Sequence, residues 1–213
     1  MAENKEEYRS PSLILRFEGQ RCIHSRNCVL GHPGVFQPNV EGHWIRLEAA
    51  SAEQVAHLAR LCPSGAITYE RLDGGENEGA PPVNHLRIWE NGPLALHADL
   101  RIAGQEPAYR ATLCRCGASQ NKPFCDRSHV TANFQATGEP PTLDSPALTE
   151  RGGRLSVTPL PNGPLQVEGN LEICAASGRT VQRTQKAFLC RCGASAKKPF
   201  CDGSHKKVGF NAP

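Results

Sequence analysis

The sequence predicts an α+β fold, with an N-terminal domain followed by two small β-rich units that contain short helices. Three observations lead to this expectation. Only 38% of the 213 residues are hydrophobic and 6% are aromatic, which is too few for one large core. Ten cysteines suggest that each unit is held together by more than packing. A 16-residue motif also occurs twice in the second half of the chain.

Composition excludes several classes of protein. The charged fraction of 21% and the net charge of +3 argue against a wholly disordered chain. No run of 18 apolar residues occurs, so we expect no membrane span. The first seven residues are acidic and no apolar stretch follows, which argues against a targeting peptide and favours a cytoplasmic location. Ten cysteines in such a chain are more typical of metal ligands than of disulfides.

The repeated motif divides the second half of the chain. It covers 114–129 and returns 76 residues later at 190–205, and both copies read C-x-C-x8-C-x3-H. An Asn-Gly-Pro-Leu stretch precedes both copies, and the second copy has five extra residues between that stretch and its cysteines. Gly- and Pro-rich stretches at 73–82 and 138–153 read as linkers or surface loops. The predicted domains are therefore 10–72, 83–130 and 154–211.

Each repeat unit shows the pattern of strands. Apolar residues alternate at Leu86/Ile88, Leu94/Leu96, Leu100/Ile102, Tyr109/Ala111/Leu113, Leu155/Val157 and Leu171/Ile173. The later Pro-Phe-Cys-Asp stretch predicts a short helix with Pro123 or Pro199 in its first turn.

The motif carries residues that bind metals. On a short helix, Cys125 and His129 would face the same way because they are four residues apart. Cys114 and Cys116 would share one face of an extended chain. Two such pairs could hold two irons bridged by sulfide. The alternative is a structural zinc site, although zinc motifs usually separate paired cysteines by two to four residues.

The second copy matches a known signature. Cys-Asp-Gly-Ser-His at 201–205, together with Cys190, Cys192, Ser195 and Pro199, resembles the CDGSH iron–sulfur family, also called NEET proteins. The first copy matches except at Arg127, where the family has glycine, and we expect this arginine to adopt a helical conformation. The resemblance implies two [2Fe–2S] clusters. Their ligands would be Cys114, Cys116, Cys125 and His129 in one copy, and Cys190, Cys192, Cys201 and His205 in the other.

Family members are either homodimers with one motif per chain or single chains with two motifs. This chain resembles the second kind, which implies a monomer whose repeats are packed as an internal pseudo-dimer, related by a pseudo-two-fold axis.

The N-terminal domain contains three further cysteines, Cys22, Cys28 and Cys62. Segments 13–17 and 67–70 read as strands, and Ser51 begins a capping box for a helix that leads to Cys62. Residues 12–72 resemble the divergent single-cluster ferredoxin-like domain. The resemblance implies a [3Fe–4S] cluster, or a [4Fe–4S] cluster whose fourth ligand is His24 or Ser25. The alternative is a domain without a cluster.

Other residues are expected to be structural. Cys174 matches an alanine in the first repeat and reads as a small buried residue. Five histidines have no ligand spacing: His32, His43, His57, His85 and His97. Trp44 and Trp89 are expected to pack in the core rather than to carry electrons.

The motifs provide no nucleophile, general base or substrate pocket, so we expect a protein that is not an enzyme. Histidine ligation raises the potential of a [2Fe–2S] centre. Electron transfer is the first hypothesis, cluster donation or redox and iron sensing the second, and a zinc module the third. The expected partner is a redox protein or an apo-protein that accepts a cluster.

Residues 151–213 carry ten Lys/Arg against three Asp/Glu. This basic third of the chain is either a solvated surface or a docking surface for an acidic partner. Nucleic acid is not expected as a partner, because aromatic residues do not alternate with the basic ones.

Overall fold

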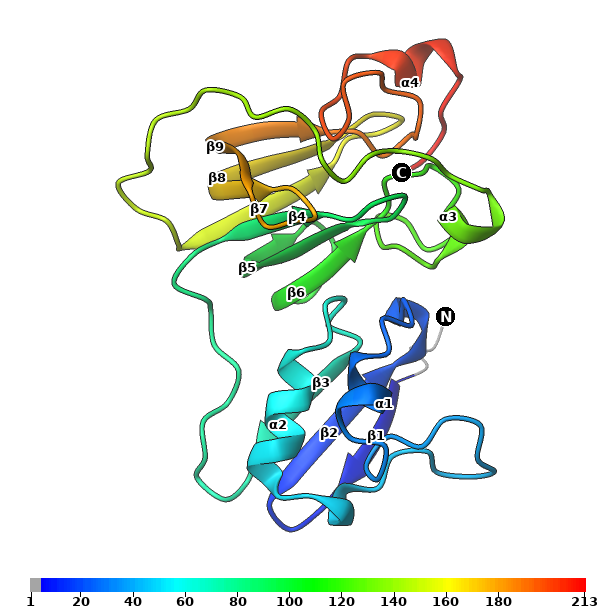
Figure 1. Ribbon diagram of the computed structural model, residues 1–213, viewed down its shortest axis with the longest axis vertical. Helices are drawn as coiled ribbons and strands as arrows, with labels where there is room; N and C mark the ends of the chain where they lie inside the picture. Colours follow the sequence, from blue (N-terminus) through cyan, green and yellow to red (C-terminus); the bar gives the residue numbers. More distant parts are fainter. Residues whose placement is uncertain (1–4) are drawn as a thin grey trace. The chain divides into compact units, whose positions relative to one another are not determined.

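The structure is a computed structural model that describes residues 5–213. The chain divides into two compact units, Met1–Gly79 and Ala80–Pro213 (Figure 1). Strands make up most of the regular structure and the helices are few and short, so the α+β class is confirmed.

The first unit is built on a three-stranded antiparallel sheet with the order β1-β2-β3. Its strands are β1 Lys5–Arg9, β2 Leu13–Glu18 and β3 Ile67–Arg71, so both strands predicted here are confirmed. The helices are η1 Gly19–Arg21, α1 Asn27–Gly31, η2 Leu47–Ala49 and α2 Ala52–Arg60.

The sequence around Ser51 explains where helix α2 begins. The Ser51 hydroxyl accepts a hydrogen bond from the backbone N–H of Gln54, and the Gln54 side chain accepts one from the backbone N–H of Ser51. This is the predicted capping box, and it satisfies two N–H groups that a helix start leaves unpaired. Val55, Leu58 and Ala59 on the inner face are buried in the core of the first unit.

The second unit contains one six-stranded sheet. Its strands are β4 His85–Ile88, β5 Leu94–Ile102, β6 Ala108–Leu113, β7 Arg154–Pro159, β8 Leu165–Cys174 and β9 Thr180–Leu189. Every alternating segment predicted in the repeats lies in one of these strands. Helices α3 Ser128–Thr131 and α4 Ser204–Lys207 follow β6 and β9 respectively.

The two repeats share this sheet reciprocally. Strand β4 runs antiparallel to β5 of its own repeat and parallel to β8 of the other, so Leu86 faces both Leu96 and Ile173. Strand β7 likewise runs antiparallel to β8 and parallel to β5. Buried side chains from both repeats form one continuous core. Neither repeat therefore has a complete sheet or a complete core of its own.

No helix between residues 5 and 213 has both the length and the apolar character that crossing a membrane requires.

Candidate metal centres

Each repeat places its first two cysteines directly after a strand, β6 or β9. The Sγ atoms of Cys114 and Cys116 are 3.7 Å apart, and so are those of Cys190 and Cys192. Two sulfurs bound at about 2.3 Å to one tetrahedral metal would be separated by about 3.8 Å. The spacing of both pairs therefore suits a single metal atom.

The third cysteine and the histidine form a second pair in each repeat. The Sγ atom of Cys125 lies 3.4 Å from Nδ1 of His129, and the Sγ atom of Cys201 lies 3.3 Å from Nδ1 of His205. A thiolate and an imidazole on one tetrahedral metal would be about 3.5 Å apart. The predicted ligands of each motif therefore stand as two close pairs.

Backbone pairing brings the two pairs of one motif together. The N–H of Cys114 donates to the carbonyl of Pro123 at 2.8 Å, and the N–H of Cys125 donates to the carbonyl of Thr112 at 2.9 Å. Matched contacts of 2.8 Å in the second repeat join Cys190 to Pro199 and Cys201 to Phe188. The chain therefore folds back along the strand end, and the third cysteine arrives beside the first two.

The predicted helix with Pro123 or Pro199 in its first turn is wrong. Phe124 and Phe200, which follow these prolines, form isolated bridges to Leu113 and Leu189. Because these residues pair with a strand, their backbone cannot coil, and the helix begins only after the next three residues.

The expectation that Arg127 adopts a helical conformation is also wrong. Its φ and ψ are 73° and 3°, close to the 86° and −2° of Gly203 in the second repeat. A Cβ at Gly203 would meet no atom within 4 Å, so the site has room for a side chain. The N–H of each residue donates to the sulfur of the preceding ligand, Cys125 or Cys201, at 3.5 and 3.4 Å. The turn needs this backbone conformation whichever residue occupies it.

Two polar motif residues hold the ligand loop in shape. The hydroxyl of Ser119 donates to the carbonyl of Phe124 at 2.7 Å, and Asp126 accepts the backbone N–H groups of Gln120 and Ser128 at 2.7 and 2.9 Å. Ser195 and Asp202 make the matched contacts in the second repeat. The hydrogen bonds from Ser204 and Ala196 lower the pKa of Asp202, so this carboxylate is charged at neutral pH.

The surroundings of the ligand side chains in the first motif shift their pKa values. The hydrogen bond between Cys114 and Cys116 lowers the pKa of Cys114 and raises the pKa of Cys116. Burial raises the pKa of Cys125 to about 11 and lowers the pKa of His129. The neutral imidazole can bind a metal directly, whereas the thiols must release protons when the metal enters.

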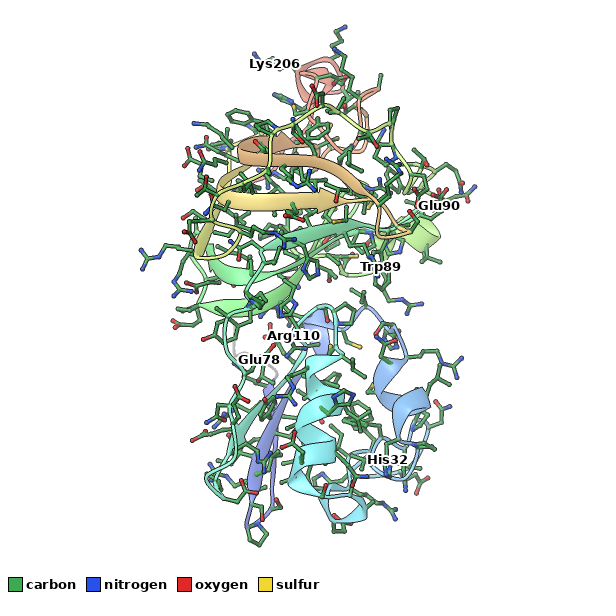
Figure 2. The ribbon with its side chains drawn as sticks, turned by 60° about the vertical axis from the view of Figure 1, so that its left-hand side comes forward. His32, Glu78, Trp89, Glu90, Arg110 and Lys206 are labelled. Atoms are coloured by element: carbon green, nitrogen blue, oxygen red, sulfur yellow. The ribbon has the colours of Figure 1, made fainter. Side chains whose placement is uncertain are left out.

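Sequence reasoning missed a buried arginine between the paired cysteines of each repeat. Arg115 and Arg191 are each 1% exposed. Arg115 donates at 2.6–3.0 Å to the main-chain carbonyls of Trp89, Gly92, Ala136 and Thr137. Arg191 donates to those of Leu160, Gly163 and Pro213. In Figure 2, Trp89 marks the segment whose carbonyl Arg115 contacts. The sequence did contain a sign of these arginines, because an arginine lies between the paired cysteines in both copies of the motif.

In the part of the chain that the structure describes, no three or more His, Cys, Asp or Glu side chains gather at one point that could hold a single metal ion.

The three N-terminal cysteines contribute to one core. Cys62 is buried in it, and the partly buried Cys22 and Cys28 pack against it. Burial raises the pKa of the Cys28 thiol, and the nearby thiols of Cys62 and Cys22 raise it further. His24 is exposed and Ser25 is partly buried. The structure therefore brings the three cysteines into one region, and the fourth ligand remains a prediction.

The remaining residues that the sequence singled out have ordinary surroundings. Cys174, at the end of β8, is half-buried rather than buried, and burial raises the pKa of its thiol. Trp44 packs edge-on against Phe17 with ring centroids 4.9 Å apart, as a core residue should. His85 and His97 pack against each other across strands β4 and β5 at 5.3 Å.

Comparisons with known proteins agree with this architecture. The family model described as "Iron-binding zinc finger CDGSH type" matches residues 91–130 and 162–206, once in each repeat. The model described as "Divergent 4Fe-4S mono-cluster" matches residues 8–72.

Two curated relatives match the chain. One is CDGSH iron-sulfur domain-containing protein 1 of Mus musculus, which is 32% identical over 96 residues. The other is the protein of the same name from Rattus norvegicus, which is 31% identical over the same length. Each alignment covers 45% of this chain and 82% of the relative. The chain belongs to the CDGSH iron–sulfur family, and it is an iron–sulfur protein.

Proposed function

We propose that each CDGSH motif binds one [2Fe–2S] cluster through three cysteines and one histidine. The observation that supports this best is the division of each ligand set into two pairs, 3.7 Å apart for sulfur–sulfur and 3.3–3.4 Å apart for sulfur–nitrogen. A two-iron cluster needs two protein ligands on each iron. A single zinc ion would need all four to converge on one point.

Metal and sulfide analysis tests this proposal. Protein purified without oxygen should be coloured and should contain two irons and two sulfides for each motif. Two equivalents of zinc without sulfide would overturn it.

We further propose that the two repeats form an internal pseudo-dimer. The reciprocal pairing of β4 with β8 and of β7 with β5 supports this arrangement. It is what two copies of a CDGSH unit would show if they exchanged their first strands across a two-fold axis.

The chemistry of such clusters favours electron transfer. A bound cluster supplies one-electron oxidation and reduction, and the chain's own side chains bind it and set its potential. In the first motif the four predicted ligands would hold the cluster, and Ser119 and Asp126 shape the loop that carries them. The hydroxyl and carboxylate that could act as nucleophile or general base are thus engaged in structural hydrogen bonds, which supports a role other than that of an enzyme.

Cluster donation is the second candidate. One ligand of each cluster is an imidazole, and His129 and His205 are only partly buried at the start of a short helix. Protonation can displace an imidazole that water reaches. Incubation with an apo-ferredoxin separates the two functions, because an electron carrier keeps its clusters and a donor loses them.

For the N-terminal domain we propose a third cluster, held by Cys22, Cys28 and Cys62. Their place in one core supports this proposal. A [3Fe–4S] cluster needs three protein ligands, so the serine at position 25 is no obstacle. Oxidised [3Fe–4S] is paramagnetic and oxidised [2Fe–2S] is not, so an EPR signal from the oxidised protein should come from this domain alone. A domain that is free of iron after anaerobic purification would contradict the proposal.

The second repeat offers a surface for an acidic redox partner. Lys197, Lys206 and Lys207 are exposed beside its ligand loop and have no ion pair among residues 5–213. Lys206 extends away from the second unit in Figure 2. The first repeat has uncharged residues at the matched positions: Asn121, Val130 and Thr131. We propose that an acidic electron carrier docks at the second repeat, with His205 at the contact.

A further inference from the structure

The buried arginines Arg115 and Arg191 make no ion pair with an Asp or Glu side chain among residues 5–213, although Glu90 acts on Arg115 from a distance. Their guanidinium groups donate to main-chain oxygen atoms, and one acceptor of Arg191 is the main-chain oxygen of Pro213, the last residue of the sequence. The Nη1 atom of Arg191 has no hydrogen-bond partner at all. A buried charge without a counter-charge strongly destabilises a fold. A negative charge close to each arginine would remove this penalty.

The turns that contain these arginines pack directly on each other. A Cβ built on Gly117 would lie 2.5 Å from the carbonyl oxygen of Cys192. A Cβ built on Gly193 would be still closer to the carbonyl oxygen of Cys116. The backbones of the two Cys-Arg-Cys-Gly turns are therefore in contact, and the paired cysteines of one repeat lie next to those of the other.

Aromatic rings join each arginine to the opposite repeat. The ring of Phe210 has Arg191 at 5.5 Å and Lys122 of the first repeat at 5.9 Å. The matched ring of Phe134 has Arg115 at 5.4 Å and Lys198 of the second repeat at 5.9 Å. These stacks and the main-chain carbonyls hold both guanidinium groups in fixed positions between the repeats.

The electrostatic interactions also cross between the repeats. Burial lowers the pKa of Arg115 to about 10, and the carboxylate of Glu90 together with the thiols of both repeats opposes the shift. Burial lowers the pKa of Arg191, and negative charge at Cys114 of the other repeat opposes it. The position that matches Glu90 is Pro161, so Arg191 lacks the additional carboxylate.

We propose that Arg115 and Arg191 are cross-repeat counter-charges, each of which favours the reduced state of the metal centre in the opposite repeat. This inference rests on the proposed [2Fe–2S] clusters. Reduction adds one negative charge to a cluster, and a fixed cation nearby stabilises the added charge. A guanidinium suits this role because it stays protonated and its fork can bind several carbonyls at once. The two arginines are positioning residues and not ligands.

The test measures the potential of each cluster separately. His205→Cys serves as the background, because an added thiolate should lower the potential of the second centre and so resolve it from the first. In this background, Arg191→Gln and Arg115→Gln each remove one charge and retain an amide that can donate to a carbonyl. Redox titration followed by EPR then gives the reduced-to-oxidised ratio of each centre.

Arg191→Gln should shift the first centre about tenfold towards the oxidised state at a fixed potential, which corresponds to 59 mV for one electron. The second centre should change less than threefold. Arg115→Gln should act mainly on the second centre. Its shift should be smaller than the one that Arg191→Gln causes at the first centre, because Glu90 already balances part of the Arg115 charge. An equal or larger shift at the arginine's own repeat, or no shift at either centre with iron retained, overturns the proposal.

Arg191→Lys separates charge from structural support. It keeps the positive charge but cannot reach three carbonyls at once, so it should lower stability and shift the first centre less than Arg191→Gln does. A Lys variant that shifts the potential as far as the Gln variant overturns the role of charge.

If Arg191→Gln loses its iron, Arg115→Gln, which removes the matched charge, gives the decisive measurement. A shift confined to its own repeat, or no shift at either centre with iron retained, is then the contrary result. Wild-type protein without a [2Fe–2S] spectrum would instead refute the proposed function on which this inference rests.

Discussion

Single residues around the ligand helices show how the backbone conformation outweighs the identity of the side chain. Arg127 and Gly203 precede their helices with almost the same positive φ, 73° and 86°. Such a conformation costs a residue with a Cβ about 1–2 kcal/mol. The first repeat accepts this strain, because the N–H group that points at the ligand sulfur is required in both copies.

The strain at Arg127 leads to a stability prediction. Arg127→Gly should stabilise the protein by about 0.5–1 kcal/mol, because relief of the strain exceeds the added entropy of the unfolded chain. The reciprocal Gly203→Arg should destabilise it by a similar amount, since the site has room for the side chain. Urea unfolding of the iron-loaded protein without oxygen measures both changes. Destabilisation by Arg127→Gly would show that the arginine side chain makes contacts that offset its strain.

The histidine ligands lead to a prediction about potential and pH. His129→Cys should retain a cluster with a potential lower by roughly 200 mV, since thiolate adds a negative charge where imidazole had none. Acid should also release the variant's cluster at a lower pH, because imidazole must be neutral to bind. Burial lowers the pKa of His129, so in the wild type this competition begins only below the usual range of histidine. Redox titration and a pH series of the visible spectrum measure these effects, with the exposed His57→Cys as control. Equal potentials in the variant and the wild type would exclude His129 as a ligand.

At the scale of elements, we expect the Cys-Arg-Cys-Gly turns to be the segments that are most sensitive to substitution. Gly117 and Gly203 have φ values of 85° and 86°, so adding a Cβ strains the two backbones equally. They differ in their surroundings, because a Cβ on Gly117 would clash with the backbone of Cys192 and one on Gly203 would meet nothing.

Gly117→Ala should therefore destabilise the protein by about 2–5 kcal/mol and reduce the iron content of both repeats. Gly203→Ala should cost only about 1–2 kcal/mol and leave the iron content unchanged. Iron analysis together with urea unfolding compares the two variants. If Gly117→Ala were as mild as its control, the direct packing of the two turns would be wrong.

The sequence predicted these elements where local rules decide the outcome. Alternating apolar residues identified the strands, and the capping box at Ser51 identified the start of helix α2. The spacing of the motif predicted which ligands form pairs, because residues two apart share one face of an extended chain and residues four apart meet across a helical turn. The predicted helix at Pro123 failed since pairing with the end of β6, a tertiary contact, determines the conformation of that segment.

Tertiary structure also explains what the sequence could not predict. Alternation shows which side chains of β4 are buried, but not that β8 of the other repeat lies beside it. A lone arginine normally indicates an exposed surface, whereas Arg115 and Arg191 are buried by carbonyls from loops more than 20 residues away.

At the scale of the whole molecule, the division into units predicts what a truncation retains. A chain of residues 80–213 keeps its whole sheet and core, so it should fold and bind about four irons and four sulfides, two of each per cluster. A chain of residues 80–131 should neither fold nor bind iron, because β4 and β5 lose their partners β8 and β7. Circular dichroism and iron analysis compare the two chains. A folded, iron-loaded 80–131 fragment would show that the shared sheet is dispensable.

The unequal charge of the repeats leads to a prediction about electron delivery. A reduced plant-type ferredoxin with negative net charge and a potential near about −400 mV is a suitable donor, since a one-histidine cluster should lie higher. Lys206→Gln with Lys207→Gln removes two positive charges beside His205. Val130→Glu with Thr131→Glu changes the net charge by the same amount at the matched positions of the first repeat.

The lysine variant should be reduced about tenfold more slowly than the wild type at low salt, because electrostatic steering at a docking surface changes association rates by about that factor. The variant Val130→Glu with Thr131→Glu should change the rate of reduction less than twofold. Near 1 M salt the difference should vanish, since the Debye length falls to about 3 Å. Stopped-flow absorbance measures the rates. Equal slowing by both variants would mean that only net charge matters, and it would remove the second repeat as the preferred entry point for electrons.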